Sequence, residues 1–225
     1  MTAGSTVIGD DAVSTRERIL REASRLFAAR GYYGSSTRDI AAAVGVQQPS
    51  LFHHFESKQA ILQELLGYSL EDSVAVAEYL AKAEGSASAR LYRFLVEDLR
   101  FLMDSPYDLR SIFSGDLLSE EEFHSWGALD DRLHNAVADL IRQGIEAGEF
   151  VEIDVGFATH AVLGMMLETI RERSLGGTVP AERPRRAAEF VLRGFLGDPR
   201  RIETVAKEAC ALANLPAYRD VGSSE

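Results

Sequence analysis

The side chains best suited to chemistry stand close together near the amino end. Gln48 can bind adenine through two hydrogen bonds, and the Ser50 hydroxyl can bond to a base edge or a phosphate. Pro49 offers an apolar surface for a thymine methyl group. Arg38 and Lys58 flank these residues and add cations that attract phosphate. This set of residue types favours contact with double-stranded DNA.

Two helices are expected before this segment. Ser-Thr-Arg-Glu at 14–17 reads as a capping box that starts a helix, and Gly31 ends it. A second, short helix is expected to start at Ser36 or Thr37 and to end at Gly45. Its inward residues are expected to be Ile40, Ala43 and Val44.

A third helix must then present the chemical groups. It is expected to begin near Gln48, with Pro49 suited to the first helical position. Leu51 and Phe55 lie one turn apart and are expected to hold one side of this helix against the core. The opposite side is turned outward and carries Gln48, Pro49, Ser50, Phe52 and His53. Two helices joined at Gly45 in this way form a helix-turn-helix pattern.

The rest of the chain predicts helices throughout, because apolar residues recur at intervals of three and four without sustained alternation. The fold class is therefore all-α. Helices are expected at 58–82, 88–103, 119–148 from a second capping box, 154 to about 175, 182–196 and 199–213, with a short piece at 107–114. We expect a helix-turn-helix domain at 14–62, a larger helical domain at 63–215, and flexible ends at 1–13 and 216–225.

The distribution of charge divides the chain at the expected domain boundary near residue 62. The net charge is −11, but residues 14–62 contain seven basic and four acidic side chains, so this part carries +3 and the remainder −14. A basic head on an acidic body predicts two parts with different partners. The acidic body disfavours DNA contact away from the head.

The segment at 15–66, containing RERILREASRLFAARGYYGSSTRDIAAAVGVQQPSLFHHFESKQAILQELL, resembles the DNA-binding domain of TetR-family transcriptional regulators. The positions that match the family are Ile19, Ala23, Leu26, Phe27, Gly31, Thr37, Ile40, Ala41, Gly45, Val46, Leu51, Phe55, Lys58 and Leu62. The resemblance implies an all-helical homodimer, whose variable carboxy-terminal region binds a small effector and dimerises through its last two main helices.

The resemblance also implies roles for single residues. Base contacts are implied for Gln48, Pro49 and Ser50, and contacts to phosphate or the groove wall for Thr37, Arg38, His53, His54 and Lys58. Gln47, at the turn, can touch either. Phe52 stands where the family usually has Tyr, so one phosphate hydrogen bond per half-site is expected to be missing.

An effector pocket is expected between helices of the larger domain. Its candidate lining residues are Phe101, Tyr107, Phe113, Trp126, His134, Met165 and Met166, with His134, His160, Asn135 and Thr159 available to orient polar atoms. Residues at such spacing can equally be ordinary core. Small residues at Ala158, Ala161, Gly164, Ala187, Ala188 and Gly194 suit either a dimer interface or packing within one subunit.

The sequence therefore predicts a DNA-binding regulator, a repressor that a small-molecule effector releases from a palindromic operator. An enzyme is the competing class, but no catalytic motif such as Gly-x-Ser-x-Gly or His-Glu-x-x-His occurs. No metal site or cofactor is expected, and the separation of His124 from His134 argues against a shared metal. A head that binds protein in place of DNA remains a third possibility. No apolar run reaches membrane-spanning length, so a cytoplasmic protein is expected.

Overall fold

The computed structural model describes residues 13–110, 121–174, 180–212 and 215–219. These residues form helices and connecting segments without a β-strand, apart from an isolated antiparallel bridge between Phe150 and Leu196. The elements are α1 (Thr15–Arg30), α2 (Thr37–Val44), α3 (Gln48–Phe52), α4 (Lys58–Lys82), α5 (Ala87–Asp104), the 3-10 turn Glu121–Phe123, α7 (His124–Glu146), α8 (Val155–Ser174), α9 (Arg183–Phe195), the 3-10 turn Pro199–Arg201 and α10 (Ile202–Ala211). None of the helices in these ranges has the length and apolarity needed to cross a membrane.

Local side chains define the ends of α1 and α2. The Ser14 hydroxyl accepts from the backbone N–H of Glu17 at 3.1 Å, and α1 ends at Gly31, whose φ is +74°. Ser36 and Asp39 form a reciprocal capping box at the start of α2. Gly45 ends α2 in the left-handed conformation, with φ +79°. The chain therefore reverses where the sequence predicted it would.

The inner face of α2 differs in one residue from the prediction. Ile40 and Val44 are buried as expected, but Ala43 is exposed and Ala41 is buried in its place. Both alanines lie within a turn of the two larger residues, so spacing alone cannot choose between them. In the structure α2 packs against α1, and Ala41 is 2% exposed.

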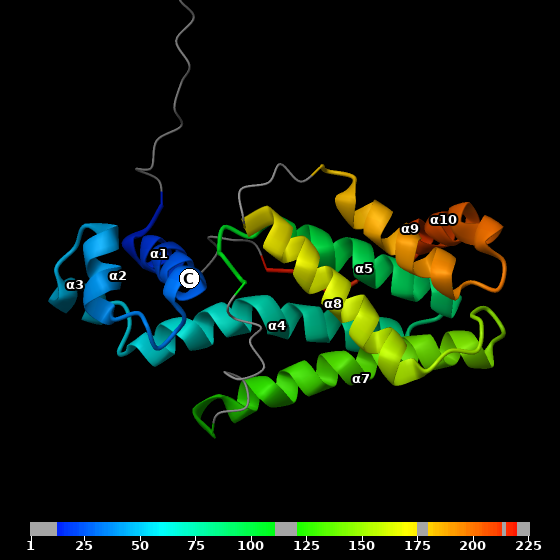
Figure 1. The fold of residues 1–225 in the computed structure, drawn as a ribbon, viewed down its shortest axis with the longest axis horizontal. Helices are drawn as coiled ribbons and strands as arrows, with labels where there is room; N and C mark the ends of the chain where they lie inside the picture. Colours follow the sequence, from blue (N-terminus) through cyan, green and yellow to red (C-terminus); the bar gives the residue numbers. More distant parts are fainter. Residues whose placement is uncertain (1–12, 111–120, 175–179, 213–214, 220–225) are drawn as a thin grey trace, which may run out of the picture.

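The long helix α4 joins the head to the body. Its N-cap is Ser57, whose hydroxyl accepts from the Ala60 N–H at 3.0 Å, and the helix spans the predicted range 58–82. Figure 1 shows α4 running from the α1–α3 head along the body beside α5 and α7. The same helix therefore contributes to both predicted domains, and a boundary at 62 falls inside it.

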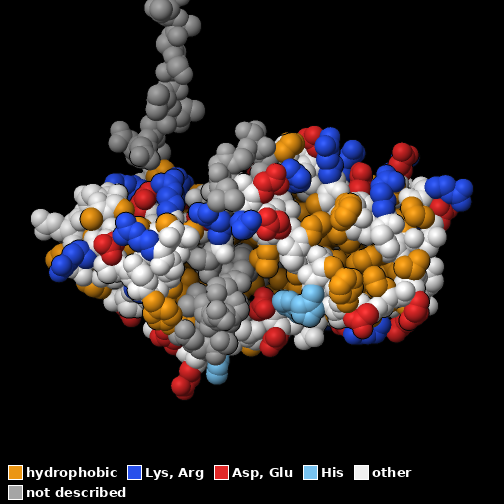
Figure 2. All heavy atoms as spheres, viewed as in Figure 1, with side chains coloured by type: hydrophobic (Ala, Val, Ile, Leu, Met, Phe, Trp, Pro, Cys, Tyr) orange, Lys and Arg blue, Asp and Glu red, His pale blue; other side chains and the backbone are white. Residues whose placement is uncertain are grey.

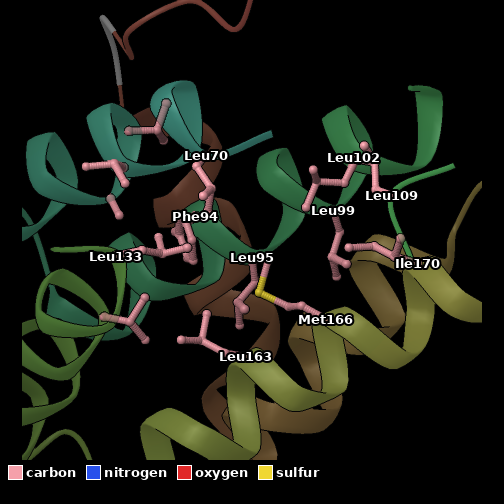
Figure 3. Packing of buried hydrophobic residues seen from close by; sticks show 14 of the residues in the cluster. Leu70, Phe94, Leu95, Leu99, Leu102, Leu109, Leu133, Leu163, Met166 and Ile170 are labelled. Atoms are coloured by element: carbon pink, nitrogen blue, oxygen red, sulfur yellow. The ribbon is translucent and has the colours of Figure 1, made fainter. Parts of the chain in front are cut away.

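The body core lies between α4, α5, α7 and α8. Figure 3 shows Leu95 and Leu99 of α5 directed toward Met166 and Ile170 of α8. The predicted capping box at 119–122 lies partly outside the described residues. The described part has a 3-10 turn before α7, which begins at His124. Half of the predicted piece at 107–114, residues 111–114, and the predicted helix end at about 175 also lie outside the described residues.

Two charged side chains fix the end of the body farthest from the head. Arg90 is 7% exposed and donates to the Leu80 carbonyl at 3.0 Å and to Gln143 Oε1 at 2.8 Å. Glu149 accepts from the backbone N–H groups of Ala87 and Ser88 at the start of α5. These bonds tie α4, α5 and α7 together, so the body can hold a fixed cavity.

The described part of the carboxy-terminal segment, 215–219, contacts the body, whereas a flexible end was expected from 216; residues 220–225 lie outside the described residues. Tyr218 stacks on Phe101 with ring centroids 4.6 Å apart, and its hydroxyl donates to Asp98. Arg219 binds Asp72 and Glu71 of α4 at 2.8–3.0 Å. The polar composition of this segment favoured a frayed end, because sequence spacing does not reveal contacts more than a hundred residues away.

Candidate nucleic-acid interface and internal cavity

The outer surface of α3 carries the predicted chemical groups. Leu51 and Phe55 are 0% and 4% exposed and hold the inner side of this region against the core. On the outside, the exposed residues are Arg38, Gln47, Pro49, Phe52, His53 and His54, and the half-buried ones are Thr37, Gln48, Ser50 and Lys58. The ten residues predicted to contact DNA therefore all lie at or near the surface of the head.

A hydrogen bond orients Gln48. Its Nε2 donates to the Thr37 hydroxyl of α2 at 2.9 Å. The amide keeps a second N–H and its carbonyl oxygen, which are the two groups needed to bind adenine at N7 and N6. Thr37 thus holds the side chain of Gln48 while leaving this N–H and the carbonyl oxygen available.

Lys58 is partly committed within the head. Its ammonium donates to the carbonyls of Tyr32 and Ser35 at 2.7 and 2.9 Å and lies 4.0 Å from the centre of the Tyr32 ring. Burial lowers the pKa of Lys58 from its usual value. The ammonium therefore holds the loop between α1 and α2, with a third N–H remaining for another partner.

Other cations of the head are also engaged. Arg16 pairs with Glu64, and Arg18 donates to the Val44 carbonyl at the end of α2. Arg21 and Arg25 pair with acidic residues of their own helix. Arg38 is exposed on the first turn of α2. The local excess of basic residues thus serves largely to hold the head together, and sequence counting cannot separate this role from DNA contact.

The body contains a cavity of about 260 Å³ between α4, α5, α7 and α8. Most of its wall is apolar, and it also holds two carboxylates and two imidazoles. The lining residues are Ser69, Ser73, Asp98, Leu102, Asp130, Leu133, His134, His160, Leu163, Gly164, Met166, Leu167 and Ile170. An apolar cavity with a few polar groups is typical of a small-molecule site.

The predicted pocket residues divide between this cavity and a neighbouring aromatic cluster. His134 and Met166 line the cavity, and so does His160. Phe101 and Tyr107 lie outside its wall and pack against Tyr68, with centroids 4.9 and 4.8 Å apart. Trp126, Met165, Asn135 and Thr159 are also absent from the lining, and Phe113 lies outside the described residues. Aromatic composition alone could not distinguish a wall residue from core.

Sequence reasoning missed Asp98, the most buried charged group of the cavity. It is 1% exposed, and burial raises the pKa of Asp98 to about 7. Tyr218 donates to its Oδ1 at 3.2 Å, and the Ser73 hydroxyl also faces it. A signal was available, because Asp98 falls on the same helical face as Leu91 and Leu95, where an acid is unusual.

Two imidazoles meet at the same cavity from different helices. The rings of His134 and His160 have centroids 5.7 Å apart. His134 Nδ1 lies 2.9 Å from the Asp130 carbonyl oxygen, and His160 Nδ1 lies 2.7 Å from that of Gly156. A carbonyl oxygen can only accept, so Nδ1 carries the proton in both rings and Nε2 is the acceptor of each neutral ring.

Comparisons with known proteins agree with this geometry. Residues 19–65 match the model of "Bacterial regulatory proteins, tetR family", and 84–195 match "Tetracyclin repressor-like, C-terminal domain". The chain is 30% identical to the HTH-type transcriptional repressor AcnR of Corynebacterium efficiens, over 75% of this chain and 84% of AcnR. It is 28% identical to the HTH-type transcriptional repressor KstR2 of Rhodococcus jostii, over 74% and 83%. The structure of Mycobacterium smegmatis AmtR superimposes with a TM-score of 0.75 at 29% identity, over 91% of this chain and 97% of AmtR.

The chain belongs to the TetR family of bacterial regulatory proteins. It is a DNA-binding transcriptional regulator with an amino-terminal helix-turn-helix domain and a larger helical domain, as its sequence predicted. The first matched segment contains α2 and α3, and the second contains α5, α7 and α8, which supply most of the cavity wall. The family assignment favours regulation over catalysis for this TetR-family protein.

Proposed function

We propose that this TetR-family regulator is a homodimeric cytoplasmic repressor that binds a palindromic operator and leaves it when a small molecule enters the cavity. The observation that carries this proposal is the outward surface of α3. There Thr37 holds the side chain of Gln48, while the side chains of Pro49 and His53 are exposed. The similarity to two transcriptional repressors, over about three quarters of this chain, supports repression. Two heads related by a two-fold axis would place their α3 helices in successive major grooves.

Contacts to the DNA backbone complete this reading head. The first turns of α2 and α4, capped in part by the Ser36 and Ser57 hydroxyls, lie beside Arg38 and Lys58 and attract phosphate through the helix dipole. Phe52 is 47% exposed and has no hydroxyl, so it supplies apolar contact without a phosphate hydrogen bond. We assign base reading to Gln48, Pro49 and Ser50, and positioning to Thr37, Arg38, Gln47, His53, His54 and Lys58.

An apolar face on α8 and α9 supports the dimer. Phe157, Ala161, Gly164 and Leu167 follow one another at helical spacing on the outside of α8, and Phe190 of α9 is 77% exposed. Figure 2 shows apolar side chains gathered on the side of the body where Figure 1 places α8 and α9. A patch of this kind on a soluble protein favours association. Three of the predicted small residues, Ala158, Ala187 and Ala188, instead pack within the subunit.

Substitution of this face tests the dimer. We expect Phe190→Glu to shift the protein from dimer to monomer in analytical ultracentrifugation, because a charge would be buried at the interface. Tyr79→Glu is the matched control, since Tyr79 is an exposed aromatic residue of α4 away from this face. A Phe190→Glu protein that sediments as wild type would contradict the proposed interface.

The structure offers a route from the cavity to the head. Leu102 lines the cavity near the end of α5, and the chain just beyond it reaches α1. There the Tyr107 hydroxyl donates to Glu17 at 2.7 Å, and the Asp108 N–H donates to the Ser24 hydroxyl at 3.0 Å. An effector that binds one arrangement of these helices better than the other would shift the head through these contacts.

The function is tested with DNA from upstream of the protein's own gene. We expect a mobility shift that unlabelled random DNA does not remove, and lower expression of a reporter under that region. Gln48→Ala should weaken specific binding by about 1–3 kcal/mol and relax one base position. Random DNA should bind the variant and the wild type equally. An increase of reporter expression would indicate activation, and absence of any shift would favour a head that binds protein.

A further inference from the structure

The polar groups of the cavity share a property that restricts what it can bind. Asp98 and Asp130 offer carboxylates, and His134 and His160 offer Nε2 as acceptor when neutral, because both Nδ1 protons are committed to carbonyls. The hydroxyl of Ser69 is directed to the Leu65 and Leu66 carbonyls. No Lys or Arg belongs to the described lining of this cavity. The wall is thus rich in hydrogen-bond acceptors and has no permanent cation.

The deepest of these groups is the carboxylate of Asp98. It is 1% exposed, its Oδ1 accepts from Tyr218, and its neighbours within the fold are Ser73 and Asp72 of α4. The Ser73 hydroxyl donates to the Ser69 carbonyl at 3.1 Å, so Tyr218 is the donor to Asp98, and a carboxylate can accept about four hydrogen bonds. An ionised carboxylate in an apolar wall loses hydration free energy, and this loss is large unless a cation pairs with the carboxylate. A ligand that brings a positive donor group would therefore gain most at this position.

Cavity size limits the rest of the ligand. About 260 Å³ is slightly below the roughly 300–1,000 Å³ typical of drug-sized ligands. Leu102, Leu133, Leu163, Met166 and Ile170 surround it and offer only apolar contact. A single ring or a short alkyl chain fits these dimensions and this surface.

We propose that the effector is a small, mostly apolar organic amine whose ammonium group donates to the carboxylate of Asp98. The inference rests on the proposed effector role of the cavity. His134, His160 and Asp130 accept any further N–H groups near the cavity opening, and the apolar part of the ligand packs between α5 and α8. The ammonium group lies beside the Asp98 carboxylate, which already accepts a hydrogen bond from Tyr218.

An anionic effector is the main competitor. A neighbouring hollow of about 160 Å³ shares Gly164, Leu167 and Ile170 with the cavity and is also lined by Arg110 and Arg171. Both guanidinium groups are already paired, Arg110 with Asp108 at 2.6 Å and Arg171 with Glu168 at 3.1 Å. The larger cavity has two carboxylates and no Lys or Arg in its described lining, and therefore favours the amine.

The test uses three ligands with one carbon skeleton and the full-length protein. Phenethylamine, 2-phenylethanol and phenylacetate are titrated by calorimetry at pH 8. We expect the amine to bind at least about tenfold more tightly than the alcohol, and phenylacetate to bind weakest. In Asp98→Asn the affinity for the amine should fall to that of the alcohol. Asp139→Asn, an exposed acid of α7 paired with Arg142, is the matched control and should bind as wild type.

A pH series separates Asp98 from the other groups of the cavity. The amine affinity of the wild type should fall by about tenfold from pH 8 to pH 6, as Asp98 takes up its proton. His134→Gln/His160→Gln should keep this dependence, and Asp98→Asn should lose it. The Asp130 and Asp72 carboxylates and the Tyr218 hydroxyl are unchanged in both variants.

Several results would overturn the inference: tightest binding of phenylacetate, unchanged amine affinity in Asp98→Asn, or no binding of any of the three ligands. A DNA mobility shift on the same preparations distinguishes failure of the amine proposal from failure of the proposed function. Specific DNA binding without amine binding would retain the repressor and reject the amine. Amine binding that leaves the protein on its DNA would retain the ligand site and reject its role as the effector site.

Discussion

At the scale of single residues, the head shows how one side chain can prepare another for recognition. We propose that the Gln48 amide reads a base, and the Thr37 hydroxyl, which accepts a hydrogen bond from this amide, restrains its direction. The sequence indicated both residues as DNA contacts and could not indicate that they contact each other, because they lie on different helices. Thr37 is therefore a positioning residue for Gln48 as well as a candidate phosphate contact.

This coupling gives the first prediction. Thr37→Val keeps the shape of the side chain and removes its hydroxyl, so the Gln48 amide loses its anchor. The measurement compares binding to the operator with binding to an operator whose contacted adenine is replaced. We expect the difference in binding free energy between these two sequences to fall by roughly 1 kcal/mol in competition mobility shifts. Thr37→Ser keeps the hydroxyl and should discriminate as wild type. An equal loss on random and specific DNA would assign Thr37 to phosphate contact alone.

A second prediction concerns Lys58, whose ammonium binds the Tyr32 and Ser35 carbonyls. Lys58→Met fills similar space but leaves both carbonyls without this donor. We expect the free energy of unfolding in urea to fall by about 1–3 kcal/mol. Lys207→Met, which removes an exposed lysine of α10, should leave it unchanged. Full stability of Lys58→Met would show that Lys58 serves only DNA contact.

At the scale of elements, most of the helices could be predicted because their ends are local. Ser36 with Asp39, Ser57, and Asp154 cap helices within three residues, and Gly45 ends α2. Which face of α8 is inside could not be predicted, because apolar residues occupy both sides of this helix. Ala161, which suited either a dimer interface or packing within one subunit, is exposed on the same side as Phe157 and Gly164.

The surface of α3 could be predicted better than the cavity, because the first depends on local sequence and the second on contacts between distant helices. The outward residues of α3 follow from the burial of Leu51 and Phe55, four positions apart on one short segment. The cavity is assembled from four helices, so its wall depends on packing that no local pattern records. The sequence placed His134 and Met166 among several candidates. Asp98 was not a candidate, because it lies between leucines that recur at helical spacing.

At the scale of the whole molecule, Asp98 links the cavity to stability. Its pKa is about 7 in the fold and about 3.8 in the unfolded chain, so the folded state binds more protons between these values. The contribution of Asp98 to stability is therefore lost as the pH rises from about 4 to about 7. The charge that develops is the one an amine would neutralise.

This linkage gives a further prediction. In urea denaturation we expect Asp98→Asn to be more stable than wild type at pH 8, with a difference on the order of a few kcal/mol. At pH 4 the two proteins should be nearly equal, because Asp98 is then protonated in the fold. Asp139→Asn provides the control at both pH values. A constant difference across this range would show that Asp98 does not titrate near neutral pH.

The unbroken course of α4 has a mechanical consequence. Ser69 and Ser73 line the cavity on the same helix whose first turn holds the head through Lys58. Eleven residues separate Lys58 from Ser69, which is roughly 17 Å of stiff rod. A tilt of α4 by only a few degrees at the cavity would displace its first turn by roughly an ångström. In the proposed two-fold dimer, the distance between the two heads would change by about twice this displacement. Modest ligand-induced strain can thus alter the spacing of two reading heads without unfolding either one.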